Sequence, residues 1–476
     1  MTRTFRGKDL RAVWLLGLIA LFLFADQNLM APNLTQIADE FGFSAEQRDV
    51  KLGGHISLSF WLFGGVIALF IGYLTDRMGR RWLFGAVVLI GEIPCLLTGF
   101  AQTYEQLFWL RAATGIGIGG AMPLVYSLIG DYFPAAQRPR ATAYIGLAMG
   151  LGIALGQFAA GFLGPDYGWR LPFIVVAAPN FVLGALFLIT VKEPMRGQAE
   201  DSLDEWLASD PMSEQGYVYT GQISWSSYRA LFRVPSNLLI FLQGALGTVP
   251  WGVFFVYLND FLAQEKGYSV RSATAIVLFI GAASIAGSFV GGLWGNRLYN
   301  KNPALLPLLC GIATLVGVLP TAILLSYPSQ IGVDDPALVP PLVIGMVAGF
   351  SVAITAPNVR AMLLDVNPPE TRGSVFALYN LADDVGRGLG PFLISAMIVV
   401  AGRLWAFHVA NALWIGCGLL LLAMTRTFPA DETALRRTLP MRADKLPRAK
   451  VSRLRNPRAR CTLSMRADKL PGGEDQ

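Results

Sequence analysis

Charged residues, histidine and cysteine are all scarce in this chain of 476 residues. Only 15% of the residues are charged and 54% are hydrophobic, whereas soluble domains carry roughly 25% charge. So few charges cannot cover the surface of a soluble protein of this length. The two histidines and four cysteines, with no CxxC pair, form no pattern typical of a zinc site or a disulfide framework. The composition therefore indicates a membrane protein and predicts no cofactor.

Several catalytic patterns are also missing. The chain contains no GxxxxGK[ST], HExxH or GxSxG sequence, which argues against a nucleotide-driven pump and against a membrane hydrolase. We therefore expect a protein that is not an enzyme. The net charge of +6 does not indicate nucleic-acid binding, because residues 1–428 are neutral and residues 429–476 carry the whole excess. We expect this basic tail to be disordered.

Twelve apolar stretches are long enough to cross a bilayer, which takes about 20 residues. If the N-terminus is cytoplasmic, 16 Lys and Arg residues lie at cytoplasmic ends and loops and six at outer ones. This bias predicts a multi-pass protein of the inner (plasma) membrane with both termini in the cytoplasm. The stretches are 11–32, 54–75, 82–101, 106–130, 141–163, 170–191, 237–260, 272–295, 304–326, 339–363, 373–400 and 404–425.

The two halves of the chain repeat one another. Six residues between Pro123 and Gly156 recur 234 positions later, and Gly72 and Arg77 recur 220 positions later. Repeated six-span halves are a transporter architecture. We therefore expect an all-α membrane protein with twelve transmembrane helices in two pseudo-symmetric six-helix bundles. The expected units are bundles at 1–191 and 237–428, a cytoplasmic linker at 192–236 with interfacial helices near 202–207 and 225–232, and the tail at 429–476.

Two motifs resemble those of a known family. The sequence GYLTDRMGRR at 72–81 is similar to the loop 2–3 signature of the major facilitator superfamily, and Arg111 with Gly115, Gly117 and Gly119 is similar to its span 4 signature. The resemblance covers about residues 10–426. It implies two bundles that rock about a site near the middle of the membrane.

A weaker likeness points to the spinster-like lipid transporters within that superfamily. Ile118 stands where that branch has a carboxylate. The resemblance implies transport of a lysolipid-like or sphingolipid-like molecule. It rests on Asp26, Arg111, the sequence IGD at 129–131, QG at 243–244 and PWG at 250–252.

The loop 2–3 motif predicts a gate at the cytoplasmic face. Asp76 can face the positive N-terminal end of span 11, and Arg77 or Arg80 can pair with Asp131. Breaking such contacts would accompany the rocking of the halves. The candidate gating residues are Gly72, Asp76, Arg77, Arg80, Asp131, Asn296 and Arg297.

Acidic residues inside spans are the candidates for proton coupling. Asp26 and Arg111 are expected at similar depth and could form a pair that protonation of the carboxylate releases. Asp383, Asp384 and Arg387 in span 11 form a rival group, in which Asp383 and Arg387 are i,i+4 neighbours. A fixed structural ion pair is the alternative for Asp26 and Arg111.

Spans 1, 4, 7 and 10 are expected to line the substrate cavity. Its few polar groups suit an amphiphilic or lipid-like small molecule. The sequence thus predicts a monomeric secondary active transporter, coupled to protons and surrounded by membrane lipids. The alternatives are a proton-driven multidrug efflux antiporter and a facilitator of a small organic metabolite. The candidate substrate residues are Gln27, Asn28, Met122, Tyr126, Gln243, Trp251, Phe254, Thr355, Asn358 and Arg360.

Overall fold

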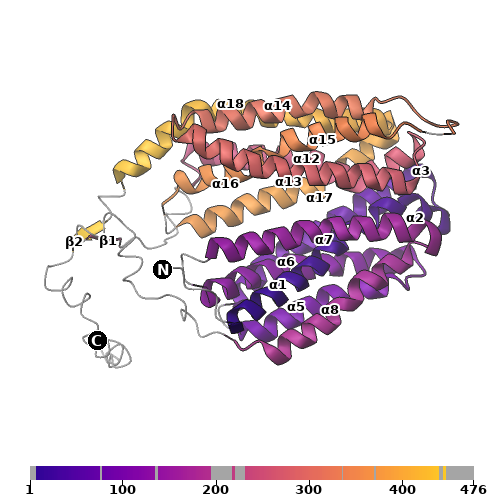
Figure 1. Ribbon diagram of the computed structural model, residues 1–476, viewed down its shortest axis with the longest axis horizontal. Coiled ribbons are helices and arrows are strands. Elements are labelled where there is room, and N and C mark those ends of the chain that lie inside the picture. The colour runs from indigo at the N-terminus through magenta and orange to yellow at the C-terminus, as the bar shows by residue number, and fades with distance from the viewer. Residues whose placement is uncertain are drawn as a thin grey trace, which may run out of the picture.

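The computed structural model describes residues 7–75, 78–133, 138–193, 217–219, 231–334, 336–368, 371–438 and 443–445. In this part of the chain, twelve helical segments are long and apolar enough to cross a membrane. They form two bundles that lie side by side, the first half coloured indigo to magenta and the second pink to yellow (Figure 1). The expected twelve-helix, all-α membrane fold is confirmed. It has one small addition, a pairing of β1 (Tyr217–Tyr219) with β2 (Ala443–Lys445).

The first half holds spans 1 to 6. We call the end that carries α2 and α3 the outer end, following the orientation expected from the Lys and Arg distribution. There the Thr103 hydroxyl accepts from the Gln106 N–H and so caps α6. The elements are α1 (Gly7–Ala25), η1 (Asp26–Asn28), η2 (Ala31–Asn33), α2 (Leu34–Glu40), α3 (Ala45–Gln47), η3 (Arg48–His55), α4 (Ile56–Thr75), α5 (Arg80–Thr98), α6 (Tyr104–Tyr132), α7 (Arg138–Tyr167) and α8 (Arg170–Thr190).

The second half holds spans 7 to 12. Here the Ser269 hydroxyl caps α13 at the outer end by accepting from the Ser272 N–H. The elements are α12 (Pro235–Gln264), α13 (Val270–Tyr299), α14 (Leu305–Leu325), α15 (Val339–Ala353), α16 (Thr355–Asp365), α17 (Arg372–Ala401) and α18 (Arg403–Thr438).

Span 1 is interrupted where the sequence predicts one continuous helix. The α-helix ends at Ala25, and the short turns η1 and η2 follow before α2. Pro32 has no N–H to donate to the preceding turn, which favours a break here. The break leaves the Asp26 carbonyl free to accept from Arg111 Nη2 at 2.8 Å. Irregular backbone inside a membrane is tolerated when protein groups satisfy it in this way.

Two other spans are irregular. Span 2 begins as the π-helix η3, a rare conformation that often occurs at functional sites. Span 10 is divided between α15 and α16, and the Ser288 hydroxyl donates to the Ala353 carbonyl at 3.1 Å beside the division. These irregularities lie beside the pockets and contacts described below.

Glycines let two helices of the first half approach closely. A Cβ atom at Gly115 would overlap the main chain of Phe60, and one at Gly119 would overlap that of Gly64. Larger residues would therefore separate α4 from α6. The glycines of the span 4 motif thus have a packing role, as small residues commonly have between membrane helices.

The two halves meet where α4 packs on α17 and where α7 packs on α13. Large apolar side chains remain exposed on the outside of the bundles, including Ile189 at 80%, Phe289 at 70% and Val400 at 88%. Such exposure fits a surface in contact with lipid, where apolar side chains need no covering by protein.

The basic tail begins later than expected. The helix α18 continues to Thr438, ten residues beyond the predicted end of the bundle at 428. Glu432 explains this extension, because it is buried, receives a hydrogen bond from Tyr299 and pairs with Arg436 at 2.6 Å. The interfacial helix expected at 202–207 and most of that at 225–232 lie outside the described residues.

Candidate functional site

A central cavity of about 500 Å³ lies between the two halves. Helix α7 and Asn28 of η1 line it from the first half, and all seven helices from α12 to α18 line it from the second. Its volume suits a small organic ligand, and its lining is mostly apolar. Eight residues predicted from the sequence are among those that line it: Asn28, Gln243, Trp251, Phe254, Thr355, Arg360, Asp383 and Arg387.

Aromatic side chains form one wall of the central cavity. Trp251 and Trp414 meet edge to face with ring centroids 5.8 Å apart, and Phe254 lies 5.7 Å from Trp414. The Trp414 indole N–H donates to the Gly247 carbonyl at 2.9 Å, which fixes the orientation of that ring. Such a wall can hold a flat or apolar ligand body by burial and ring contacts.

The charged groups of the central cavity leave it with an excess of positive charge. Among the described residues that line it, the charged side chains are Arg360, Arg387 and Asp383. Asp383 is 7% exposed, and in the described part of the chain its Oδ1 has no hydrogen-bond partner. Asp384, the next residue on α17, also interacts with Arg387 but does not line the cavity, so the lining presents two arginines and one carboxylate to a ligand. This lining attracts an anionic ligand and disfavours a cationic one.

Two glutamine amides line the central cavity, and they differ in whether their atoms have hydrogen-bond partners. The Gln243 amide is engaged, because Nε2 donates to the Ile240 carbonyl at 3.0 Å and Oε1 lies 3.5 Å from Cys417 Sγ. Gln157 is 3% exposed, and both of its amide atoms lack a partner in the described part of the chain. Gln157 was not among the predicted residues, although a glutamine inside an apolar span was a visible signal.

A smaller pocket of about 180 Å³ adjoins the central cavity towards the outer end. Asn28, Ile153, Phe255 and Arg387 line both spaces, so the two are neighbours. Of the other predicted residues, Gln27 and Arg111 line the smaller pocket.

Asp26 and Arg111 lie together but not as the expected side-chain pair. Arg111 donates to the main-chain carbonyl of Asp26, while the Asp26 carboxylate lies beside the Cys95 thiol and has no nitrogen or oxygen hydrogen-bond partner among the described residues. The broken helix explains the difference, because it offers the guanidinium a carbonyl in place of the carboxylate. Asp26 is completely buried and lines neither pocket.

A second buried acid lies close to Asp26 in the first half. Glu92 accepts a short hydrogen bond from Asn180, whose amide also donates to the Ile19 carbonyl at 3.2 Å. Glu92 and Asp26 interact electrostatically, and Cys95 interacts with both. The hydrogen bond between Glu92 and Asn180 joins α5 to α8.

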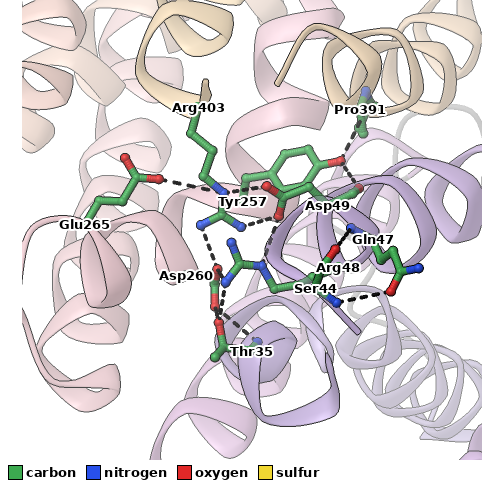
Figure 2. Close-up of polar contacts among 10 residues, drawn as sticks. All are labelled: Thr35, Ser44, Gln47, Arg48, Asp49, Tyr257, Asp260, Glu265, Pro391 and Arg403. Atoms are coloured by element: carbon green, nitrogen blue, oxygen red, sulfur yellow. Dashed lines mark hydrogen bonds and ion pairs between the residues drawn. The ribbon is translucent and has the colours of Figure 1, made fainter. Parts of the chain in front are cut away.

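Four buried charges join the halves at the outer end, and we call them the outer ion-pair cluster (Figure 2). Each half supplies one arginine and one aspartate: Arg48 and Asp49 from η3, Asp260 from α12 and Arg403 from α18. All four are at most 8% exposed. No pattern in the sequence indicated this cluster, because Asp49 and Arg403 are 354 positions apart.

Each arginine of the cluster contacts both aspartates. Arg403 Nε donates to Asp49 Oδ2 at 2.8 Å, and Arg403 Nη1 lies 2.8 Å from Asp260 Oδ2. Arg48 Nε donates to Asp49 at 3.1 Å, and Arg48 Nη1 lies 3.5 Å from Asp260 Oδ2. Two positive and two negative charges therefore balance one another across the junction of the halves.

Neutral groups and one further acid surround the cluster. The Thr35 hydroxyl donates to Asp260 at 2.6 Å, and the Tyr257 hydroxyl lies 2.9 Å from the Asp49 carbonyl oxygen (Figure 2). Glu265 lies 3.8 Å from Arg403 at the rim, and burial raises its pKa although Arg403 opposes the shift. These contacts hold the outer ends of the halves together.

The remaining substrate candidates lie away from the two pockets. Met122 packs against the apolar core of the first half, and Tyr126 is 44% exposed on α6. The Asn358 amide donates to the Gly291 and Ile354 carbonyls at 3.0 and 2.9 Å, which is a packing role. Neither these three residues nor Asp384 is among the residues that line the pockets.

Most of the expected gate lies outside the described side chains, at positions 72, 76, 77 and 131. Arg80 is described: its main-chain N–H donates to Glu193 at 2.7 Å, and its Nη1 lies 3.1 Å from Ser127 Oγ. Asn296 and Arg297 are exposed near the inner end of α13. The gate therefore stays a prediction.

A family model described as Major Facilitator Superfamily matches residues 16–339 and 337–466, which is more than half of the chain. The chain belongs to the Major Facilitator Superfamily. A bacterial homologue of the human lysosomal transporter Spinster, solved in an inward-facing, unoccupied conformation, has a similar fold. Its TM-score is 0.71 at 18% identity, and the match covers 93% of this chain and all of that one.

Relatives of this chain include proteins named as transporters of organic acids. The cis,cis-muconate transport protein of Acinetobacter baylyi is 23% identical, over 83% of this chain and 89% of its own length. The 4-hydroxybenzoate transporter PcaK of Pseudomonas putida is 28% identical, over 58% of this chain and 63% of its own. This superfamily member is thus a multi-pass membrane transporter of small molecules, and its family and relatives are transporters rather than enzymes.

Proposed function

We propose that this transporter moves a small amphiphilic organic anion, such as an aromatic monocarboxylate, by proton-coupled alternating access. One observation carries the proposal: the cavity between the halves has two arginines, one aspartate and an aromatic wall. The arginines favour a carboxylate, and the rings favour an apolar body. The excess of positive charge disfavours the cationic drugs that a multidrug efflux antiporter would carry.

The organic-acid relatives support this substrate class over a lipid. Two relatives are named for cis,cis-muconate and 4-hydroxybenzoate, and each of these compounds combines a carboxylate with a small carbon skeleton. The spinster-like branch expected from the sequence would instead carry a lysolipid, which is also an amphiphile. The structural similarity to a Spinster homologue concerns the fold, so a lysolipid is kept as a competing substrate in the test.

Buried acids support the coupling to protons. Asp26 is completely buried, with no nitrogen or oxygen donor to its carboxylate among the described residues, and Asp383 lies at the cavity beside Arg387. Carboxyl groups inside membrane spans commonly form proton relays. A carboxylate that binds a proton in one conformation and releases it in the other would tie transport to the pH gradient.

Transport by the purified protein in liposomes would test the substrate class. We expect benzoate to accumulate when the pH gradient is imposed and a lysolipid and tetraphenylphosphonium not to accumulate. Arg360→Ala should lower benzoate uptake about tenfold or more, because it removes a charge that lines the cavity. Lys301→Ala, at an exposed position just after the inner end of α13, is the matched control. Gradient-driven lysolipid movement without benzoate movement would overturn the proposal.

We also propose that the protein is a monomer in the inner (plasma) membrane, with both termini in the cytoplasm. The excess of Lys and Arg at the expected cytoplasmic ends supports this orientation. With a membrane-impermeant reagent, a single cysteine placed at Gln330 should react in intact cells, whereas one placed at Lys301 should react only after the cells are permeabilised. Labelling of both from the same side would contradict the topology.

A further inference from the structure

The smaller pocket brings an arginine from each half to one space. Arg111 on α6 and Arg387 on α17 both line its volume of about 180 Å³. Among the described residues that line this pocket, none is acidic. Asp26 interacts with Arg111 and Asp383 interacts with Arg387, but both acids lie outside the lining of this pocket. The lining itself therefore presents two positive charges and no carboxylate to a ligand.

Both guanidinium groups have N–H donors without a hydrogen-bond partner among the described residues. In the described part of the chain, Nε and Nη1 of Arg111 and Nε of Arg387 have no hydrogen-bond partner. Arg111 is only 2% exposed, so it has little access to solvent at this depth. A buried cation with unused N–H groups is unfavourable unless an anion or water completes it.

Aromatic rings hold the guanidinium groups in place. Arg111 lies 5.1 Å from the Phe60 ring and 5.5 Å from the Phe173 ring. Arg387 lies 5.4 Å from the Trp61 ring. Cation–π contacts of this kind position a guanidinium without using its N–H donors. Those donors remain available for a ligand.

We propose that the smaller pocket is a carboxylate-binding subsite between Arg111 and Arg387. The inference rests on the proposed function, because the carboxylate would be that of the transported anion, with its apolar body in the central cavity. Arg387 and Asn28 line both spaces, which allows one ligand to reach from one into the other. A small inorganic anion offers the same chemistry and is the other source that the experiment must distinguish.

The position of the subsite links the ligand to the conformation of the protein. One arginine belongs to each half, so a bound carboxylate bridges the halves just below the outer ion-pair cluster. Opening of the outer end would separate the two arginines and divide the subsite. A carboxylate should therefore bind more tightly while the outer end is closed.

Ser57 offers a test that leaves both arginines in place, because it also lines the pocket. Ser57→Asp would place a competing carboxylate beside them, and Ser57→Asn is a control of nearly equal size. Binding of benzoate and chloride to the full-length purified protein would be measured by titration calorimetry. We expect Ser57→Asp to weaken the binding of benzoate about 30-fold or more, because the new carboxylate takes the charge-assisted hydrogen bonds of the ligand. Ser57→Asn should weaken it less than about threefold.

Three further outcomes are decisive. If chloride competes with benzoate and Ser57→Asp weakens the binding of both, the two ligands share one subsite. If Ser57→Asp weakens the binding of chloride but leaves the binding of benzoate unchanged, the substrate carboxylate is not the occupant. Equal benzoate affinity in Ser57→Asp and Ser57→Asn overturns the subsite altogether.

Failure of the proposed function would be distinguishable from failure of the subsite. If liposomes transport no carboxylate, yet chloride binds with the same sensitivity to Ser57→Asp, the proposed function falls and an anion subsite stands. If benzoate is transported and Arg360→Ala reduces its uptake, while Ser57→Asp leaves binding unchanged, the proposed function stands and the subsite falls.

Discussion

Neutralising Asp49 should open the outer end of the transporter. This carboxylate receives hydrogen bonds from Arg48 of its own half and from Arg403 of the other half. Asp49→Asn keeps the size of the side chain but removes its charge from a site that is 2% exposed. Arg403 would then remain buried with Asp260 as its close acidic partner, at 2.8 Å.

The expected effect is large because the cluster is buried. Removing one partner of a buried ion pair costs about 3–5 kcal/mol. We take about 3 kcal/mol, since Asp260 still pairs with Arg403, and each 1.4 kcal/mol is a factor of ten. The ratio of closed to open outer ends should therefore fall about 100-fold, for example from about 99:1 to about equal populations.

Double electron–electron resonance, which measures the distance between two spin labels, would show this change directly. Spin labels at Glu105 in the first half and Asp334 in the second, on a cysteine-free background, report the separation of the outer ends. Asp166→Asn is the control, because its ion pair with Arg271 also joins the halves but is about half exposed. Exposed pairs contribute about 0.2–1 kcal/mol, so the control should shift the ratio less than about fivefold. Identical distance distributions for the two variants would refute the reasoning.

Three further predictions follow from other parts of the molecule. Asp26→Asn should abolish benzoate accumulation driven by a pH gradient and leave equilibrium binding intact, and full retention of gradient-driven uptake would assign the coupling to Asp383 or Asp384. Trp251→Ala should weaken benzoate binding about tenfold in calorimetry, whereas Trp405→Ala, on a 68% exposed ring, should not. Asn180→Ala should lower the unfolding free energy by about 1–3 kcal/mol in denaturation assays, because it leaves buried Glu92 without its donor; Asn300→Ala, at an exposed helix end, should change it little.

The sequence predicted the fold well because membrane spans are encoded locally. Runs of about 20 apolar residues and the repeat between the halves identify twelve helices without any knowledge of their contacts. Helix ends were harder to predict, since tertiary contacts decide them. The extension of α18 to Thr438, for example, depends on the contact between Glu432 and Tyr299.

The candidate site could be predicted only in part. Trp251 and Arg387, which line the central cavity, were among the candidates because a polar or large group inside a span is unusual. The outer ion-pair cluster was missed because its members lie near span ends, where charges are ordinary. A single sequence also does not reveal that the start of span 12 meets the start of span 2. The break at Asp26 had a signal in Pro32, but the sequence did not reveal that Arg111 would bond to the carbonyl.

Arg387 connects the parts of this mechanism. It lines the central cavity and the smaller pocket, and Gly252 on the facing helix packs against its main chain. A ligand that engages this arginine from either space therefore acts on α17, which also packs against α4 of the other half. Because the outer ion-pair cluster is neutral as a whole, it can close the outer end without a ligand. A bound carboxylate would add attraction between the halves only in that closed state, and this difference in affinity is what a transport cycle requires.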